Sequence, residues 1–181
     1  MKVVGFAAYS GAGKTTLVEQ VVALLKGRGQ RVSVIKHAHH EFDIDRPGKD
    51  SWRHRQAGAY EVLIASSRRL ALMRELEQPG AWQLEDLLDQ LDPSVDWVLV
   101  EGFKQGALPK IEVWRAEASG ESPRPVLCPQ DAFIRAIATD DAARLPEPTP
   151  LPVLDINDPA AVVAFLVDNQ DDFNHRPAGR V

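Results

Sequence analysis

The sequence has few cysteines, no excess of basic residues and no long apolar run. Its single cysteine, Cys128, cannot form an internal disulfide, which suits a reducing compartment. No apolar stretch approaches the roughly 20 residues that cross a bilayer, and the start of the chain lacks the pattern of a cleavable signal. The 21 basic residues are outnumbered by 26 acidic ones, and the net charge of −5 argues against nucleic-acid binding. We therefore expect a cytoplasmic protein without nucleic-acid or membrane partners.

The composition is that of a globular protein, with 44% hydrophobic and 26% charged residues. A chain of 181 residues can bury a sizeable core and has the length of a single domain. The segments with strand or helix character lie within residues 1–168, whereas residues 169–181 have little to bury. We therefore expect one domain over 1–168 and a mobile tail over 169–181.

A glycine-rich segment near the start of the chain gives the clearest sign of a bound ligand. It reads Ala-Tyr-Ser-Gly-Ala-Gly-Lys-Thr-Thr over residues 8–16, between an apolar run and apolar residues at helical spacing. A strand, such a turn and a helix form the context of a phosphate-binding P-loop, although Ala8 replaces the usual first glycine. Backbone N–H groups would hold the anion, Lys14 would reach the terminal phosphates, and the Thr15 hydroxyl would bind Mg²⁺. The predicted binding residues are Gly11, Ala12, Gly13, Lys14, Thr15 and Thr16.

The remaining pattern alternates strands and helices, which predicts an α/β protein. A second strand at 31–36 follows the first helix, and a strand–helix–strand unit builds a parallel sheet. Further predicted elements are a helix at 82–91, strands at 96–101, 108–115, 133–139 and 153–154, and a last helix after Asp158. Together with the glycine-rich turn, this predicts a P-loop NTPase-type three-layer fold with a mostly parallel sheet.

Two short segments with alternating apolar residues, 60–66 and 69–74, are separated by too few residues for a parallel crossover. They predict an antiparallel hairpin, which we expect at the edge of the sheet. Because an exposed edge can pair with another chain, the hairpin suggests a homodimer.

A buried strand at 96–101 ends in Glu101 and Gly102, which resembles a second nucleotide motif. In such motifs a carboxylate at a strand end meets the magnesium shell. Glu101 is one methylene longer than the usual aspartate, so its contact with the metal would run through a water. Gly102 would let its N–H approach a terminal phosphate. An ordinary strand end is the alternative.

Residues 36–51 combine three histidines with several carboxylates. On one interpretation Asp43, Asp45 or Asp50 holds Mg²⁺ or orients an attacking water, because open α/β sheets place ligands at such loops. On another, the histidines bind a transition metal; these are His37, His39 and His40. A solvated loop without either role is the third interpretation. The catalytic candidates that remain open are Asp45, Asp50 and Glu101.

Several of these segments together resemble one family. Lys-His-Ala-His-His at 36–40, Asp-Arg-Pro-Gly-Lys-Asp-Ser at 45–51, Val-Glu-Gly-Phe-Lys at 100–104 and Lys-Ile-Glu-Val at 110–113 accompany the P-loop. With these motifs the chain resembles the MobB family of molybdopterin-guanine dinucleotide biosynthesis adapter proteins. The resemblance runs from about residue 2 to residue 167, including Asp-Ile-Asn-Asp at 155–158.

The resemblance implies a P-loop GTPase-like fold that binds GTP and magnesium, hydrolyses GTP slowly if at all, and forms a homodimer. It also implies association with MobA, the guanylyltransferase that joins GMP to molybdopterin, with molybdopterin itself a candidate ligand. Carried over to this chain, Gly11 to Thr16 would hold the phosphates, Thr15 and Glu101 the metal, and Gly102 would lie near the terminal phosphate.

The base site is less defined, because the guanine-binding motif Asn-Lys-x-Asp is missing. Asp140, at a strand end, could accept the guanine N–H donors. The sequence shows no arginine finger and no certain catalytic base, so we expect slow hydrolysis without a partner. Two other functions remain open. One is a small-molecule kinase that uses the same phosphate apparatus, and the other is a metallochaperone GTPase that uses the histidine-rich loop.

Overall fold

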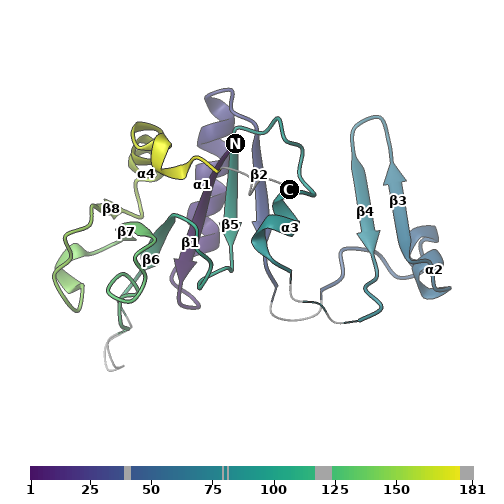
Figure 1. Cartoon of the computed structure of the whole chain (residues 1–181), viewed down its shortest axis with the longest axis horizontal. Helices are drawn as coiled ribbons and strands as arrows, with labels where there is room; N and C mark the ends of the chain where they lie inside the picture. Colours follow the sequence, from purple (N-terminus) through teal and green to yellow (C-terminus); the bar gives the residue numbers. More distant parts are fainter. Residues whose placement is uncertain (39–41, 79, 81, 117–123, 176–181) are drawn as a thin grey trace, which may run out of the picture. The chain divides into compact units, whose positions relative to one another are not determined.

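The computed structural model describes residues 1–38, 42–78, 80, 82–116 and 124–175 (Figure 1). The chain divides into two compact units. The sheet unit comprises Met1–His37 and Leu84–Val181, and the hairpin unit comprises Ala38–Gln83. Whether the chain behaves as a single domain over 1–168 stays a prediction. Within the described ranges, no helix combines the length and the apolar character that a membrane span requires.

The sheet unit is built on six strands that all run parallel to their neighbours (Figure 1). Their spatial order is β2-β5-β1-β6-β7-β8, so the first strand lies in the middle of the sheet. The strands are β1 Lys2–Ala8, β2 Val32–Lys36, β5 Trp97–Glu101, β6 Lys110–Trp114, β7 Ile134–Thr139 and β8 Val153–Asp155. The predicted α/β fold with a mostly parallel sheet is confirmed.

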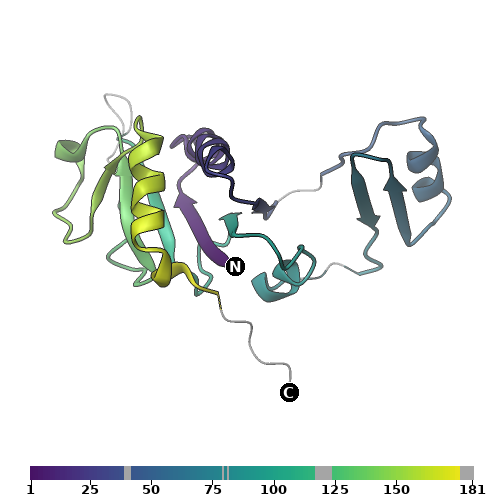
Figure 2. The same cartoon turned by 90° about the horizontal axis from the view of Figure 1, so that it is seen from above.

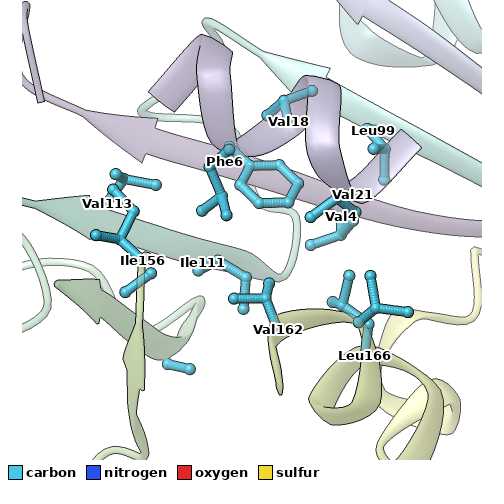
Figure 3. Packing of buried hydrophobic residues seen from close by; sticks show 14 of the residues in the cluster. Val4, Phe6, Val18, Val21, Leu99, Ile111, Val113, Ile156, Val162 and Leu166 are labelled. Atoms are coloured by element: carbon cyan, nitrogen blue, oxygen red, sulfur yellow. The ribbon is translucent and has the colours of Figure 1, made fainter. Parts of the chain in front are cut away.

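Helices cover both faces of this sheet (Figure 2). Helices α1 (Lys14–Gly27) and α4 (Pro159–Asp168) pack against one face, and α3 (Leu84–Leu88) packs against the other. Figure 3 shows how side chains from α1, α4 and the strands interdigitate on the first face. Successive strand residues point to opposite faces, so Val4 belongs to one core cluster and Val3 to the other. The predicted three layers are therefore present.

The end of the chain packs more closely than the sequence suggests. After α4, a short 3₁₀ helix at Gln170–Phe173 places Phe173 in the core with 1% of its surface exposed. Its ring lies 5.9 Å from that of Trp97, and Asn174 bridges to Lys2 in an antiparallel sense. Periodicity did not reveal this contact because a single aromatic residue carries it. The mobile tail predicted from residue 169 is thus packed at least as far as residue 174.

The hairpin unit contains α2 (Asp50–Gln56) followed by β3 (Glu61–Ala65) and β4 (Leu70–Arg74). The two strands are antiparallel, as predicted, and the Ser66 hydroxyl accepts the backbone N–H of Arg69 in the turn between them. They form a two-stranded sheet of their own. The predicted antiparallel hairpin is therefore confirmed, and the backbone groups of its strands pair with each other and not with the six strands.

Two smaller differences concern helices. The helix predicted over 82–91 is limited to α3, because its carboxyl end tightens into turns before Asp92. A short 3₁₀ helix at Ala142–Arg144 follows β7 and is capped by the side chain of Asp141.

Candidate functional site

The glycine-rich segment turns sharply between the end of β1 and the start of α1. Gly11 and Gly13 have φ angles of 79° and 87°, a region that residues with a side chain rarely occupy. Ala12 between them is buried and anchors the loop in the core. Gly13 is the N-cap of α1, and its carbonyl accepts the N–H of Leu17 at 3.1 Å. The fold thus places an ordered, glycine-dependent loop at the amino end of a 14-residue helix.

This helix end presents backbone donors to an anion. The N–H groups of Lys14, Thr15 and Thr16 precede the first bond within the helix, so helix geometry leaves them without an intrahelical carbonyl. Glycine at the N-cap supplies no side-chain acceptor for them. The positive end of the helix dipole points the same way. The loop therefore has the chemistry that binds a phosphate.

Lys14 stands beside the strand-end carboxylate that the sequence singled out. Its Nζ lies 3.9 Å from Oε2 of Glu101, and the side chains are 22% and 6% exposed. Partial burial lowers the pKa of Lys14, and Glu101 acts in the opposite direction. Two further lysines, Lys104 and Lys36, also lower this pKa because they place like charges nearby.

These three lysines make the carboxyl end of the sheet locally positive. Lys36 is the last residue of β2 and pairs in register with Glu101 of β5. Lys104 follows β5, and its Nζ lies 5.0 Å from the centre of the Tyr9 ring in the glycine-rich segment. Cations from three separate segments thus lie close enough to act on one another near the end of β5, an arrangement that attracts a polyanion.

Gly102 has a structural role that the sequence did not reveal. Its φ is 114°, and a Cβ at this position would lie 2.8 Å from both the Cβ and the carbonyl oxygen of His37. The N–H of His37 donates to the Glu101 carbonyl at 2.8 Å, and its ring lies 4.9 Å from Phe103. Glycine is therefore needed where the ends of β2 and β5 approach each other.

A small pocket of about 200 Å³ opens beside the glycine-rich loop on the α1 side. Its volume is below the roughly 300–1,000 Å³ of pockets that enclose a whole drug-sized ligand, so it suits a smaller group such as a ring system. It is lined by Gly13, Thr16, Leu17, Gln20, Arg115, Ile156 and Asn157.

Asp140, the predicted base-binding residue, lies in an ion pair with a residue of this pocket. Its Oδ2 is 3.2 Å from Nε of Arg115, but the two are not aligned for a hydrogen bond. Arg115 and Asn157 were not predicted as pocket residues from the sequence. Only their positions just after β6 and β8, where open sheets bind ligands, could have indicated them.

The predicted carboxylates of the hairpin unit hold their own loop together. Asp45 accepts hydrogen bonds from the Ser51 hydroxyl at 2.9 Å and from Nη1 of Arg55 at 3.4 Å. Arg55 also binds Asp43 at 2.9 Å, and backbone and arginine hydrogen bonds lower the pKa of Asp43. Asp50 is the first residue of α2 and has no capping role, since Lys49 is the N-cap. A catalytic role for Asp45 or Asp50 stays a prediction.

The predicted histidine cluster falls largely outside the described residues, because His39 and His40 are not among them. His37 is described and packs on Phe103 as stated above. Across the described ranges, no three histidine, cysteine or acidic side chains are grouped closely enough to hold a metal ion.

The comparisons with known proteins agree on one family. The family described as "Molybdopterin guanine dinucleotide synthesis protein B" matches residues 3–140. The chain is 40% identical over 164 residues to the molybdopterin-guanine dinucleotide biosynthesis adapter protein of Escherichia coli K12, covering 90% of each chain. It is 44% identical over 137 residues to the adapter protein of Haemophilus influenzae, covering 75% of this chain and 73% of that protein.

A solved structure supports the same assignment. The crystal structure of a MobB protein homolog from Bacillus stearothermophilus superposes with a TM-score of 0.68 at 28% identity, over 93% of this chain and 97% of that one. Sequence and fold thus agree over most of the length of these relatives. The chain belongs to the MobB family.

Proposed function

We propose that this protein is a cytoplasmic GTP-binding adapter that assists the guanylyltransferase MobA in forming molybdopterin guanine dinucleotide. Nucleotide binding is supported by one observation: Lys14, at the start of α1 beside backbone N–H groups that have no partner within the helix, lies next to the carboxylate of Glu101. The adapter part follows the names of the relatives from Escherichia coli and Haemophilus influenzae. The glycine-rich loop would hold the phosphates through Gly11 to Thr16.

The same site fits a magnesium ion. Thr15 is the second residue of α1 and offers a hydroxyl, and Glu101 offers a carboxylate at the neighbouring strand end. Oxygen donors of this kind are the ligands that Mg²⁺ prefers, with several waters retained. Bound Mg²⁺ would neutralise charge on the terminal phosphates. Glu101 has a long side chain that suits contact through a water.

The base would enter the pocket that Arg115, Ile156 and Asn157 line with α1. This pocket adjoins Gly13, so a nucleotide with its phosphates in the loop would place its ring system there. Asp140 reaches the same region through its ion pair with Arg115 and remains our candidate for the guanine N–H groups. Competition between GTP and ATP tests this assignment, because equal affinity would contradict a guanine site.

We further propose a homodimer formed through the hairpin unit. Leu63 of β3 faces Leu72 of β4 in register, and these side chains are 61% and 45% exposed. Leu70 lies on the same side of the hairpin and is 67% exposed. Such an apolar face on a two-stranded sheet with open edges favours association with a second copy.

Titration calorimetry with magnesium and GTP, GDP or ATP tests the proposed nucleotide site. We expect the protein to bind GTP, and Lys14→Ala to weaken binding about 10–100-fold through the loss of charge-assisted hydrogen bonds to phosphate. Lys26→Ala is the matched control, since Lys26 lies in the last turn of the same helix. Equal affinity of Lys14→Ala and the unaltered protein would contradict the site.

Mixing the protein with MobA on a size-exclusion column tests the adapter role separately. We expect the two proteins to elute together in a complex. Elution of the two as independent peaks at micromolar concentrations would contradict the adapter role while leaving the nucleotide site standing.

A further inference from the structure

An arginine in the connection between β6 and β7 contacts the glycine-rich loop. Nη1 of Arg124 donates a hydrogen bond to the carbonyl of Ser10 at 2.8 Å, across 114 positions in the sequence. Ser10 lies two residues after the end of β1 and four residues before the start of α1. A guanidinium group is therefore held against the segment whose backbone amides would surround a phosphate.

The backbone of Arg124 is fixed by residues of the buried sheet. The indole N–H of Trp114, the last residue of β6, donates to the Arg124 carbonyl at 3.2 Å. Two residues later, Val126 is buried in a cluster with Trp114 and Ile137. Because Trp114 is only 2% exposed, the position of the arginine is tied to the core of the molecule.

A buried carboxylate fixes the next part of this connection. Glu112 of β6 is 1% exposed, and its two oxygens accept the N–H groups of Leu127 at 2.7 Å and Cys128 at 3.0 Å. Burial raises the pKa of Glu112, while these two hydrogen bonds oppose the shift. Burying a carboxylate is costly, and its paired hydrogen bonds specify the path of the chain after Arg124. Glu112 also lies beside Ala7 of β1, just before the loop.

We propose that Arg124 binds the terminal phosphate of the nucleotide, with Trp114 and Glu112 as its positioning residues. This inference rests on the proposed nucleotide site. In P-loops the amides nearest the helix hold the inner phosphates. Ser10 precedes the N-cap Gly13 by three residues, so the arginine meets the loop away from the helix, where the phosphate chain ends. An arginine has five N–H donors in a fork, so it can hold a carbonyl and a phosphate oxygen together.

The consequence is selectivity for a triphosphate over a diphosphate. GDP lacks the phosphate that Arg124 would contact, whereas its two phosphates keep their contacts to the amides of α1 and the inner contact of Lys14, which reaches the last two phosphates of GTP. A positive charge beside the terminal phosphate would also stabilise the negative charge that spreads over this phosphate during hydrolysis. Arg124 would thus act on the terminal phosphate as an arginine supplied by the same chain, which the sequence motifs did not indicate.

The test measures GTP and GDP affinity of Arg124→Ala with magnesium present. We expect GTP affinity to fall about 10-fold or more and GDP affinity to change less than about twofold, with Arg124→Lys retaining part of the preference. Arg135→Ala is the matched control. Nη1 of Arg135 donates to the carbonyl of Ala132 at 2.7 Å, near the amino end of β7. The glycine-rich loop follows the carboxyl end of β1, so Arg135 lies at the opposite end of the parallel strands from the loop.

Three results would overturn the assignment. Unchanged GTP affinity in Arg124→Ala, or an equal loss for GTP and GDP, would show that the arginine does not bind the terminal phosphate, even though the nucleotide site stands. Absence of GTP and GDP binding in the unaltered protein would overturn the proposed function and this assignment with it.

Glu112→Gln tests the positioning role, because it keeps the shape of the side chain and removes its charge. We expect the ratio of GTP to GDP affinity to fall while GDP affinity is retained. A lower melting temperature with an unchanged ratio would show that Glu112 is structural only.

Discussion

Lys14 and Glu101 lie 3.9 Å apart, and this pair joins the glycine-rich loop to the end of β5. The two residues are 87 positions apart in the sequence, yet the parallel pairing of β1 with β5 brings their segments side by side. Glu101 partly neutralises the lysine that phosphates would contact. With nucleotide and magnesium bound, Lys14 would contact the phosphates and the carboxylate of Glu101 would face the metal shell.

Glu101→Gln should reduce the dependence of GTP binding on magnesium. Without magnesium, we expect the variant to bind GTP several-fold more tightly than the unaltered protein, because a negative charge beside the phosphates is removed. Addition of magnesium should then increase its affinity less. Calorimetry in EDTA and in excess magnesium measures both effects, and Glu19→Gln on the exposed side of α1 is the control. A magnesium effect as large as that of the unaltered protein would contradict a metal role for Glu101.

Gly102→Ala should destabilise the fold. The positive φ and the 2.8 Å approach of a Cβ to the backbone of His37 predict a loss of about 1–3 kcal/mol in the free energy of unfolding. Gly27→Ala is the matched control, because a Cβ there meets open space and alanine suits a helix end better. Denaturant titration compares the two. Equal stability of both variants would mean that the strand ends adapt without strain.

Phe173→Ala should destabilise the sheet unit although the residue lies in the predicted tail. Truncation of a buried phenylalanine costs about 3 kcal/mol or more, through lost burial and the cavity that remains. Phe133→Ala offers a comparison, since Phe133 is 41% exposed in the same unit and should cost less than half as much. Thermal unfolding followed by circular dichroism reports the difference. A Phe173 variant as stable as the Phe133 variant would show that the tail contributes little.

Leu63→Glu should convert the proposed dimer to a monomer. The substitution places a charge in the centre of the exposed apolar face, opposite Leu72, where association would have to bury it. Light scattering after size exclusion at micromolar concentration gives the mass of each species. Ser67→Glu, in the turn between β3 and β4, is the control and should leave the dimer intact. A monomeric unaltered protein would remove the dimer proposal.

The sequence predicted those parts of the fold and site that depend on neighbouring residues. The glycine-rich loop, Lys14 at the start of α1 and Glu101 at the end of a buried strand follow from local patterns of glycine, apolar spacing and strand length. The parallel sheet followed from the alternation of strands and helices. These features need no knowledge of contacts between distant segments.

Contacts between distant segments account for what the sequence did not predict. Arg124 contacts Ser10 from 114 positions away in the sequence, and the prolines on either side of the arginine do not indicate this contact. The hairpin was predicted by its turn, but alternation of apolar residues cannot say whether the strands extend the main sheet or pair alone.

A crystal structure with magnesium and a nonhydrolysable GTP analogue tests the central claim most directly. We predict the triphosphate in the loop of residues 9–13, with Lys14 on its terminal phosphates and the ring system in the pocket beside Arg115 and Asn157. An analogue bound elsewhere, or a loop that stays empty at saturating analogue, would contradict the account.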